Sequence, residues 1–231
     1  NHYGVPVSVS NLNPEHKFGI FEVGMSKAGE IGQLTKIKRP NIAIITNIGE
    51  AHIENFKNTK GIADAKSEII NNIEANGKVI LNRDDKFFNY INKKAKLKNI
   101  EVISFGKSKN SDIILLKVNQ DNEKKIITVR VKNTILRFKI KNLNVYNVLA
   151  SLAVLNELNF NLKKNINIFE NLQPSEGRGR IYKINRYKKI FNLVDESYNA
   201  NPSSTKYAIN NFSKINKGNF KKYLLLGDML E

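Results

Sequence analysis

Residues 42–82 read IAIITNIGEAHIENFKNTKGIADAKSEIINNIEANGKVILN. A β-branched run at 42–46 leads into a loop, then into a segment at 59–74 whose apolar residues recur at helical spacing. Gly77 follows this segment as a helix stop signal, and a second apolar run occupies 79–82. The order predicts a strand, a helix and a parallel strand, which is the repeating unit of α/β folds.

The same alternation extends to both sides of this unit, so we expect a mostly parallel sheet. Further expected elements are strands at 18–23 and 102–105 and helices at 27–37, 85–94 and 144–157. Residues 111–140 instead predict two or three antiparallel strands, with turns at 120–123 and 132–133.

A polar connector reaches Pro174, and a glycine-flanked stretch at 177–180 has the composition of a hinge. Strands expected at 181–184, 190–194 and 223–226, with a helix after Pro202, indicate a second α/β unit. We therefore predict two domains, 1–175 and 176–231.

Composition narrows the class of protein. The 231 residues are 41% hydrophobic, and no apolar run approaches the length of about 20 residues that a membrane span requires. No membrane insertion is expected. The chain has no cysteine, which excludes a disulfide framework and favours the cytoplasm. The net charge of +17 would attract phosphates, nucleotides or nucleic acid, but the lysines are spread along the chain, so we expect no nucleic acid partner.

Three residues stand where the ligand crevice of an open α/β sheet is expected. Glu22 lies in an apolar run and would be costly to bury without a cation such as Mg²⁺; alternatively it faces solvent or pairs with lysine. His52, in the loop after residues 42–46, is suited to a metal or a phosphate, although a lone loop histidine often binds neither. Lys66 shares the apolar face of its helix, where burial depresses a lysine pKa unless the side chain reaches the surface.

Polar residues later in the chain are candidates for nucleotide contacts. Asn144 and Asn147 lie three apart at a helix start, where asparagine caps the helix or binds an adenine edge. Arg178 can reach a phosphate or remain a solvated charge. Residues 195–202 lie between a strand and a helix N-terminus, a place suited to ribose and phosphate or to helix capping.

Taken together and in this order, these segments resemble the Mur ligase family, and within it the branch that adds D-alanyl-D-alanine. The match covers essentially the whole chain, with 108–140 its least distinctive part. Its most specific part is Ser197-Tyr198-Asn199-Ala200-Asn201-Pro202. The other matching motifs are Gly4-Val5-Pro6, Asn13-Pro14-Glu15, Phe21-Glu22-Val23-Gly24-Met25, residues 43–52, Ala65-Lys66-Ser67-Glu68-Ile69, Asn144-Val145-Tyr146-Asn147, Gly177-Arg178, Asp195-Glu196 and Gly227-Asp228-Met229.

The resemblance implies an α/β fold: a central ATP-binding domain with a P-loop-like, mostly parallel sheet, helices on both faces and a small antiparallel excursion. A truncated Rossmann-like C-terminal domain follows. The implied activity joins UDP-N-acetylmuramoyl-tripeptide to D-alanyl-D-alanine through an acyl phosphate, in peptidoglycan precursor synthesis, by a monomeric cytoplasmic enzyme. ATP and Mg²⁺ are the implied cofactors.

The resemblance also implies a metal site. Glu22 and His52 would bind Mg²⁺, and Lys66 would be carbamylated by CO₂. Carbamylation suits a desolvated amine, because it replaces an unwelcome cation with an anion that can ligate a second Mg²⁺.

For the nucleotide, the resemblance places Asn144 and Asn147 at the adenine and Arg178 at the phosphates. Either Asp195 or Glu196 would meet the ribose, and Asn199 belongs to the same nucleotide-binding segment.

Two departures from the family pattern matter. Lys141 and Leu143 stand where glycine and histidine are usual, which leaves the detail of the adenine pocket open. No G-x-x-x-x-G-K-[ST] motif occurs; we expect it just before Asn1, so we interpret the chain as a truncated fragment that is inactive alone.

Three alternatives to this function remain. They are a sister Mur or folylpolyglutamate-synthase-like ligase with another acceptor, a basic nucleic-acid-binding module, and a non-catalytic relic.

Overall fold

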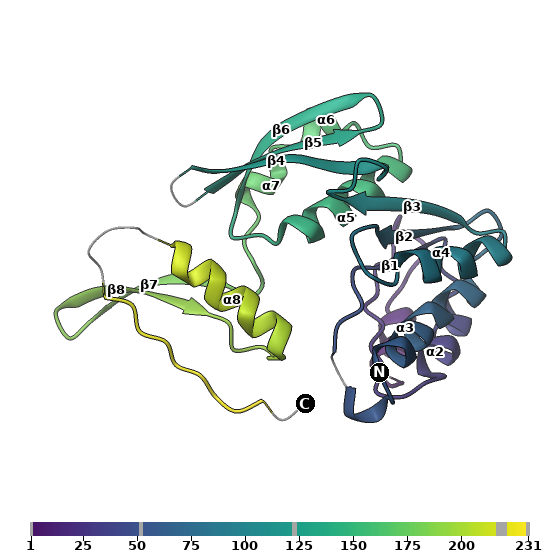
Figure 1. The fold of residues 1–231 in the computed structure, drawn as a ribbon, viewed down its shortest axis with the longest axis horizontal. Coiled ribbons are helices and arrows are strands. Elements are labelled where there is room, and N and C mark those ends of the chain that lie inside the picture. The colour runs from purple at the N-terminus through teal and green to yellow at the C-terminus, as the bar shows by residue number, and fades with distance from the viewer. Residues whose placement is uncertain (1, 51–52, 122–123, 216–220, 230–231) are drawn as a thin grey trace. The chain divides into compact units, whose positions relative to one another are not determined.

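The computed structural model describes residues 2–50, 53–121, 124–215 and 221–229. The chain divides into two compact units, residues 1–114 and 115–231. Figure 1 shows the elements of each unit, which are described in turn. The predicted domain boundary near residue 175 remains a prediction.

The sheet of the first unit is parallel, as the sequence predicts. Its strands are β1 (Ile42–Ile45), β2 (Lys78–Asn82), β3 (Glu101–Gly106) and the first residues of β4 (Ile113–Asp121). Ile80 on β2 is in register with Ile44 on one side and with Ile103 on the other. The six-stranded sheet has the order β1-β2-β3-β4-β5-β6, which gives the mixed α/β architecture expected from the sequence.

The helices of the first unit are α1 (Gly4–Ser10), α2 (Glu30–Lys38), η1 (Ile53–Asn55), α3 (Thr59–Ser67), η2 (Glu68–Asn72) and α4 (Phe88–Leu97). The helix predicted at 59–74 is α-helical as far as Ser67 and continues as the 3₁₀ segment η2. It starts where predicted because the Asn58 side chain accepts a hydrogen bond from the Gly61 N–H. The helix predicted at 85–94 begins later, since Asp85 accepts the Phe87 N–H at 2.8 Å before the first turn.

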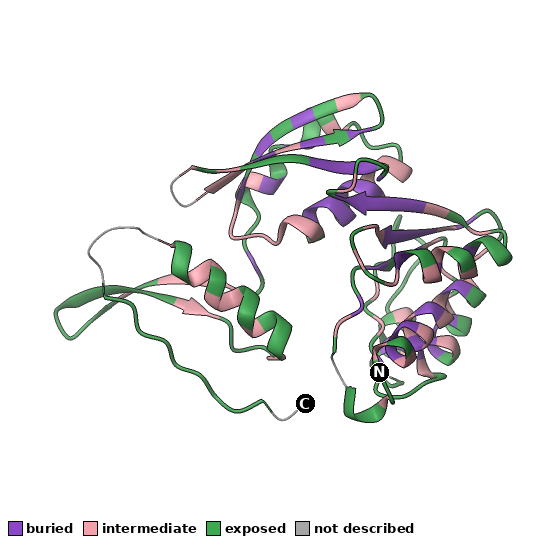
Figure 2. Cartoon of the chain, in the orientation of Figure 1, coloured by how far each residue is buried: buried purple, intermediate pink, exposed green. Residues whose placement is uncertain are grey.

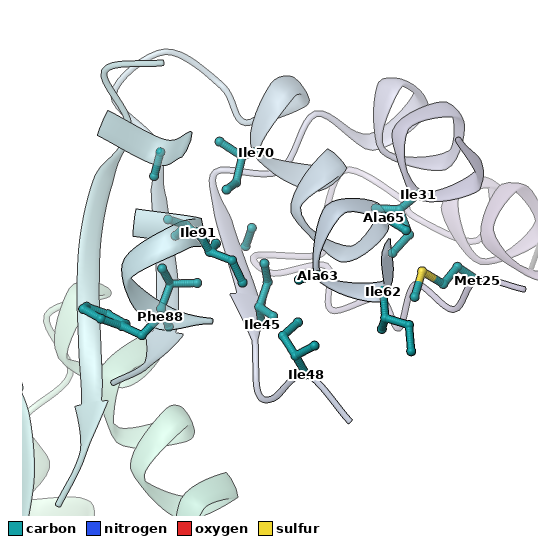
Figure 3. Packing of buried hydrophobic residues seen from close by; sticks show 14 residues of the cluster. Met25, Ile31, Ile45, Ile48, Ile62, Ala63, Ala65, Ile70, Phe88 and Ile91 are labelled. Atoms are coloured by element: carbon teal, nitrogen blue, oxygen red, sulfur yellow. The ribbon is translucent and has the colours of Figure 1, made fainter. Parts of the chain in front are cut away.

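A hydrophobic cluster joins the sheet to these helices (Figure 3). Ala43 and Ile45 from β1 and Val79 and Leu81 from β2 contribute one face of their strands. The residues of α3 that meet this face are almost inaccessible, with Ile62 0% exposed. Burial of such a side chain contributes about 1.5–3 kcal/mol, so the core positions α3 firmly.

The strand predicted at 18–23 is wrong, because the structure has neither helix nor strand there. Ile20 is 94% exposed. A strand requires backbone hydrogen bonds to a neighbouring strand, and none of the described strands pairs with this segment. The apolar pattern shows that these side chains favour a strand, but it does not show whether a neighbouring strand is there to pair with.

The second unit contains the predicted antiparallel strands and the long helix. The elements are the rest of β4, β5 (Lys124–Val131), β6 (Thr134–Lys141), α5 (Val145–Glu157), α6 (Leu162–Asn165) and α7 (Ile168–Asn171). β5 and β6 pair antiparallel across the predicted turn at 132–133. The turn predicted at 120–123 falls partly outside the described residues.

An exposed hairpin and helix follow: β7 (Arg180–Arg186), β8 (Lys189–Asp195) and α8 (Pro202–Lys214). The hairpin turns at Tyr187 and Lys188, which both have positive φ, as a two-residue turn favours. No residue of these three elements is buried, as Figure 2 shows by their green and pink colours.

The strand predicted at 223–226 is also wrong. These residues are irregular, and Leu225 is 95% exposed. The reason is the same as at 18–23, because no described strand pairs with them.

Among the described residues, no helix has the length and apolar character needed to cross a membrane.

Candidate nucleotide and metal site

Lys66 is directed toward the carboxyl end of β1. Its Nζ donates a hydrogen bond to the Asn47 carbonyl oxygen at 3.0 Å. Burial lowers the pKa of Lys66, and the Asp85 carboxylate acts in the opposite direction. The helical spacing left two positions open for the Lys66 side chain, the apolar core or the solvent. In the structure the residue is half-buried, between these two positions.

A small cavity lies at the carboxyl ends of β1 and β2, the end of a parallel sheet at which α/β folds bind ligands, and Asn47 connects it to Lys66. It is lined by Asn47, Asn82 and Asp85, together with apolar residues of β1, β2 and α4. Asn82 and Asp85 were not among the residues proposed from the sequence. Their position directly at the end of a predicted buried strand is the signal that points to them.

Asp85 holds the loop that follows β1. Its Oδ2 accepts the Ile48 N–H at 2.7 Å, while its Oδ1 accepts the Phe87 N–H at 2.8 Å. Carboxylates that accept backbone N–H groups in this way restrict the chain on both sides. The floor of the pocket is therefore tied to the start of α4.

The predicted metal ligands are only partly described. Glu22 is exposed and lies outside any helix or strand, and His52 lies outside the described residues. Within the described ranges, no group of three or more His, Cys, Asp or Glu side chains gathers closely enough to hold a metal ion. Mg²⁺ does not require such a group, because it takes one or two carboxylates and completes its shell with waters and phosphate oxygens.

The two asparagines at the start of α5 have different roles. Asn144 is the N-cap, and its Oδ1 accepts the Tyr146 N–H at 2.9 Å and the Asn147 N–H at 3.4 Å. Helix capping thus accounts for Asn144. The Asn147 side chain is exposed on the first turn and is the better placed of the two for a ligand.

Two segments of the second unit meet around Gly177. The Gly177 N–H donates to Asp195 Oδ2 at 3.1 Å, and the Gly177 carbonyl accepts the Tyr198 N–H at 3.1 Å. Gly177 has φ +70°, and a Cβ there would lie 2.7 Å from the Tyr198 nitrogen. Only glycine fits this approach.

The same junction places Arg178 beside Glu196. The Arg178 guanidinium carbon lies 4.2 Å from the centroid of the Tyr198 ring, within the range of a cation–π contact. Desolvation and the neighbouring Asp195 raise the pKa of Glu196, and Arg178 opposes them. A cation and a carboxylate therefore lie together at the end of β8.

The sequence offers Asp195 and Glu196 equally as the ribose contact, but the two carboxylates have different interactions in the structure. Asp195 Oδ1 accepts the Ser197 hydroxyl at 2.7 Å and the Ser197 N–H at 3.1 Å. These two bonds hold the pKa of Asp195 below its ordinary value, and the bond from the hydroxyl has the larger effect. Asp195 is thus engaged within the turn, whereas Glu196 interacts with the Arg178 charge.

The rest of residues 195–202 is held by local hydrogen bonds. Asn199 Oδ1 accepts the Ala200 N–H at 2.7 Å. Asn201 is the N-cap of α8 and forms a reciprocal capping box with Ser204. Capping therefore belongs to Asn201, and Asn199 stabilises the turn before it.

Comparison with known proteins gives three consistent findings. A model of the Mur ligase middle domain matches residues 1–155. The chain is similar to the UDP-N-acetylmuramoyl-tripeptide–D-alanyl-D-alanine ligases of Buchnera aphidicola subsp. Baizongia pistaciae and Bacillus subtilis, with 34% and 32% identity. Each match covers 100% of this chain and 49% of the relative.

Among solved structures, the chain is similar to MurF from Acinetobacter baumannii, with a TM-score of 0.83 and 28% identity over 92% of this chain and 46% of that one. The chain spans about half the length of the curated relatives it matches. The family model covers more than half of the 231 residues, and the chain belongs to the Mur ligase family.

Proposed function

We propose that this chain forms the ATP-handling part of a ligase that adds D-alanyl-D-alanine to UDP-N-acetylmuramoyl-tripeptide. The observation that carries the proposal is the match over 100% of the chain to ligases that bear this name. The position of Lys66 at the carboxyl ends of parallel strands supports it, because a nucleotide would bind there.

The proposed metal ligands are Glu22, His52 and Lys66. Mg²⁺, when bound, would neutralise charge on the β- and γ-phosphates during transfer. Before modification, Asn47 and Asp85 would keep the Lys66 ammonium in place, since one accepts its hydrogen bond and the other attracts its positive charge.

Lys66 would act as a carbamate derived from CO₂. The ammonium first loses one proton to become the neutral amine, which then forms an N–C bond to CO₂ and loses a second proton to water, so a cation becomes an anion. Burial favours the neutral amine by lowering the pKa of Lys66. A carbamate oxygen is a hard ligand of the kind that Mg²⁺ prefers.

The proposed nucleotide contacts come from the second unit. Asn147 would meet the adenine, and Asn144 would fix the helix start that carries it. Arg178 would contact the phosphates, and Glu196 is better suited to the ribose than Asp195, whose carboxylate is already hydrogen-bonded. Asn199 would shape the segment by its bond to Ala200.

In the proposed reaction the terminal carboxylate of the tripeptide attacks the γ-phosphorus of ATP, and ADP leaves. The amine of D-alanyl-D-alanine then attacks the acyl phosphate, and inorganic phosphate leaves as the amide forms. The residues of this chain would orient the phosphates for in-line transfer, which is where phosphoryl-transfer enzymes obtain most of their rate. The proposal assigns this reaction to a monomeric enzyme of the cytoplasm.

The proposal is tested by phosphate release from the complete protein that contains this chain. ATP, Mg²⁺, UDP-N-acetylmuramoyl-tripeptide and D-alanyl-D-alanine are supplied together and then omitted one at a time. Release that requires both peptide substrates establishes the function. Release with another amine assigns the chain to a sister ligase, and no release with any combination indicates a non-catalytic relative.

A second test concerns Lys66. We expect Lys66→Ala to reduce turnover about a hundredfold or more, as loss of a metal ligand does. ¹³C-bicarbonate NMR should detect a carbamate signal in the parent protein that is absent from the variant. Lys60→Ala is the control, because this side chain is 62% exposed on the same helix. Near-parental activity of Lys66→Ala would refute the metal-bridging role.

A further inference from the structure

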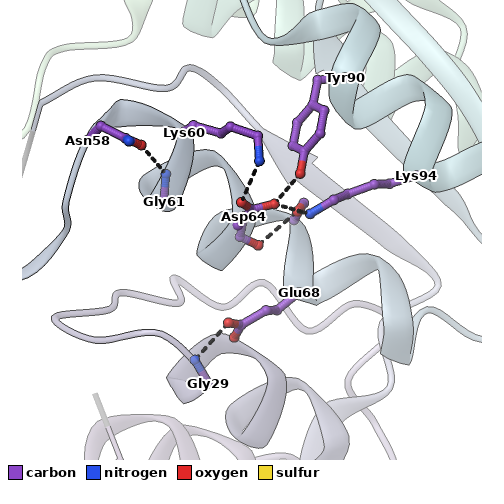
Figure 4. A network of polar contacts seen from close by, with 9 residues as sticks. Gly29, Asn58, Lys60, Gly61, Asp64, Glu68, Tyr90 and Lys94 are labelled. Carbon is purple, nitrogen blue, oxygen red and sulfur yellow. Dashed lines mark hydrogen bonds and ion pairs between the residues drawn. The ribbon is translucent and has the colours of Figure 1, made fainter.

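The N-terminus of α2 is capped by a residue from another helix. Its own N-cap, Gly29, has no side chain to accept the first-turn N–H groups. Glu68 Oε1 accepts the Gly29 N–H at 2.7 Å, and Glu68 Oε2 accepts the Gly32 N–H at 2.9 Å. Figure 4 shows the Glu68 side chain reaching Gly29. The two oxygens of one carboxylate therefore supply the cap that the local sequence lacks.

The carboxylate nearest in sequence cannot take this role, because it is used elsewhere. Glu30, the first residue of α2, accepts the Ser26 N–H at 2.6 Å and the Lys27 N–H at 3.2 Å. These bonds hold the pKa of Glu30 below its ordinary value, the one to Ser26 most strongly. Glu30 fastens the preceding loop to α2 and leaves the first turn to Glu68.

A second residue of η2 strengthens the same contact. The Asn72 amide donates to the Gly32 carbonyl and to the Thr35 hydroxyl, both at 2.9 Å. Thr35 is 1% exposed. Buried hydrogen bonds of this kind specify a single arrangement of two elements. Since η2 continues directly from α3, α2 is held in one position relative to the helix that carries Lys66.

The segment 18–29 is held at Met25 by the hydrophobic cluster and towards both of its ends by α2. It has no backbone ladder, because it is neither helix nor strand. At its far end, Lys38 Nζ from the last turn of α2 lies 4.0 Å from the centroid of the Phe21 ring. This amine is buried and makes no hydrogen bond to any residue that the structure describes, and it lies over the ring in a cation–π contact. Both Phe21 and Gly29 are therefore fastened to α2, and Glu22 lies between them.

We propose that Glu68 is a positioning residue that sets the place of Glu22 relative to Lys66. Its carboxylate fastens α2 to the chain just after α3, and α2 holds the segment with Glu22 at both ends. Glu68 itself touches neither metal nor substrate. This inference rests on the proposed function, in which Glu22 and Lys66 belong to one metal site.

The test uses Glu68→Gln in the complete protein. Glutamine keeps the size of the side chain but loses the charge and one of the two acceptor oxygens at the helix start. Glu101→Gln is the matched control, because Glu101 forms an exposed ion pair with Lys78 at 3.1 Å in the same unit. Glu68→Asp keeps the charge and serves as the second variant if Glu68→Gln does not fold.

Mn²⁺ replaces Mg²⁺ as the probe, and its binding in the presence of a non-hydrolysable ATP analogue is followed by the EPR signal of free Mn²⁺. We expect Glu68→Gln to weaken Mn²⁺ binding roughly tenfold, as the loss of an outer-shell partner does. The Mg²⁺ concentration for half-maximal turnover should rise in parallel, and Glu68→Asp should restore part of both. Glu101→Gln should change neither.

A Glu68→Gln protein with a lower melting temperature but the parental Mn²⁺ titration would overturn the inference, since a merely structural role predicts that pattern. The parent protein separates the two proposals. If the parent lacks phosphate release dependent on both peptide substrates, the proposed function fails. If the parent has this activity and Glu68→Gln titrates like it, only the role of Glu68 fails.

Discussion

Lys66 in the first unit and Arg178 in the second, both proposed as ligand contacts, are held in place by different means. Lys66 projects from α3, whose neighbouring residues Ala63 and Ala65 are 0% and 1% exposed. Arg178 stands beside β7 and β8, which have no buried residue, and is held by the bonds of Gly177 and by the Tyr198 ring. The core thus positions the first residue, and local backbone geometry positions the second.

This difference predicts which mutations should damage each region. Packing contributes most where side chains are fully buried, so the Lys66 region should respond to lost volume. The Arg178 region has little volume to lose, and it should respond to changes that its backbone cannot accommodate. Three experiments address this contrast.

The largest expected effect is on the core beneath Lys66. Ile62 is 0% exposed on the inner face of α3. We expect Ile62→Ala to lower the free energy of unfolding of this region by about 3 kcal/mol, through lost burial and the cavity that remains. Urea titration of hydrogen–deuterium exchange in peptides from α3 and β2 measures it.

The matched control is Ile190→Ala on β8, where the side chain is 65% exposed. We expect a change below about 0.5 kcal/mol in peptides from the hairpin, as for an ordinary surface substitution. Equal losses of unfolding free energy at the two positions would contradict the contrast between the regions, because they would mean that β8 is covered by a second layer.

A smaller effect is expected at the backbone junction of the second unit. Gly177→Ala places a Cβ 2.7 Å from the Tyr198 nitrogen at φ +70°. The strain should cost about 1–3 kcal/mol locally and displace Arg178, which weakens nucleotide binding. Isothermal titration with ADP and Mg²⁺ in the complete protein measures the loss of affinity.

Gly227→Ala provides the control, since a Cβ at that position meets nothing within 4 Å and its φ is not in the left-handed region. The control should bind ADP like the parent protein. If both variants bind equally well, the Gly177 junction does not position a nucleotide ligand, and the contrast with Lys66 loses its functional meaning.

The sequence predicts the region around Lys66 better than the segments that lack a partner. The run at 42–46 and the run at 18–23 have similar β-branched character, but only the first becomes a strand. Periodicity reports which residues prefer burial, and strand formation also requires a neighbour to accept the backbone hydrogen bonds. The strand predicted at the exposed run 223–226 was wrong for the same reason.

Long-range polar contacts were also beyond the sequence. Glu68 reaches Gly29 across 39 residues, and Asp85 reaches Ile48 across 37. Such contacts depend on the packed arrangement of α2, α3 and α4, so they cannot be predicted from the local spacing of residues in the sequence. Asp195 and Glu196 could not be distinguished either, because the bonds that engage Asp195 come from Ser197 in the local turn and from Gly177, 18 residues away.

The smallest expected effect concerns the polar side of α3, which joins it to α4 (Figure 4). The Asp64 carboxylate accepts hydrogen bonds from Tyr90 and Lys94 and lies 3.7 Å from Lys60 Nζ. Burial raises the pKa of Asp64, but the hydrogen bonds from Lys94 and Tyr90 outweigh it, so the pKa lies below its ordinary value of 3.8. The folded state therefore favours the ionised carboxylate.

For an acid with a lowered pKa, the stabilisation is present above the unfolded-state pKa and is lost as the pH falls through the folded-state pKa. At pH 7 we expect Asp64→Asn to cost roughly 1 kcal/mol, since the side chain is partly exposed and solvent screens the pair. Urea titrations at successive pH values should show the difference from the parent protein shrinking below pH 3.8. A difference that stays constant to lower pH would mean that α3 is joined to α4 by the shape of this network and not by its charge, which would make packing the main anchor of Lys66 on both sides of the helix.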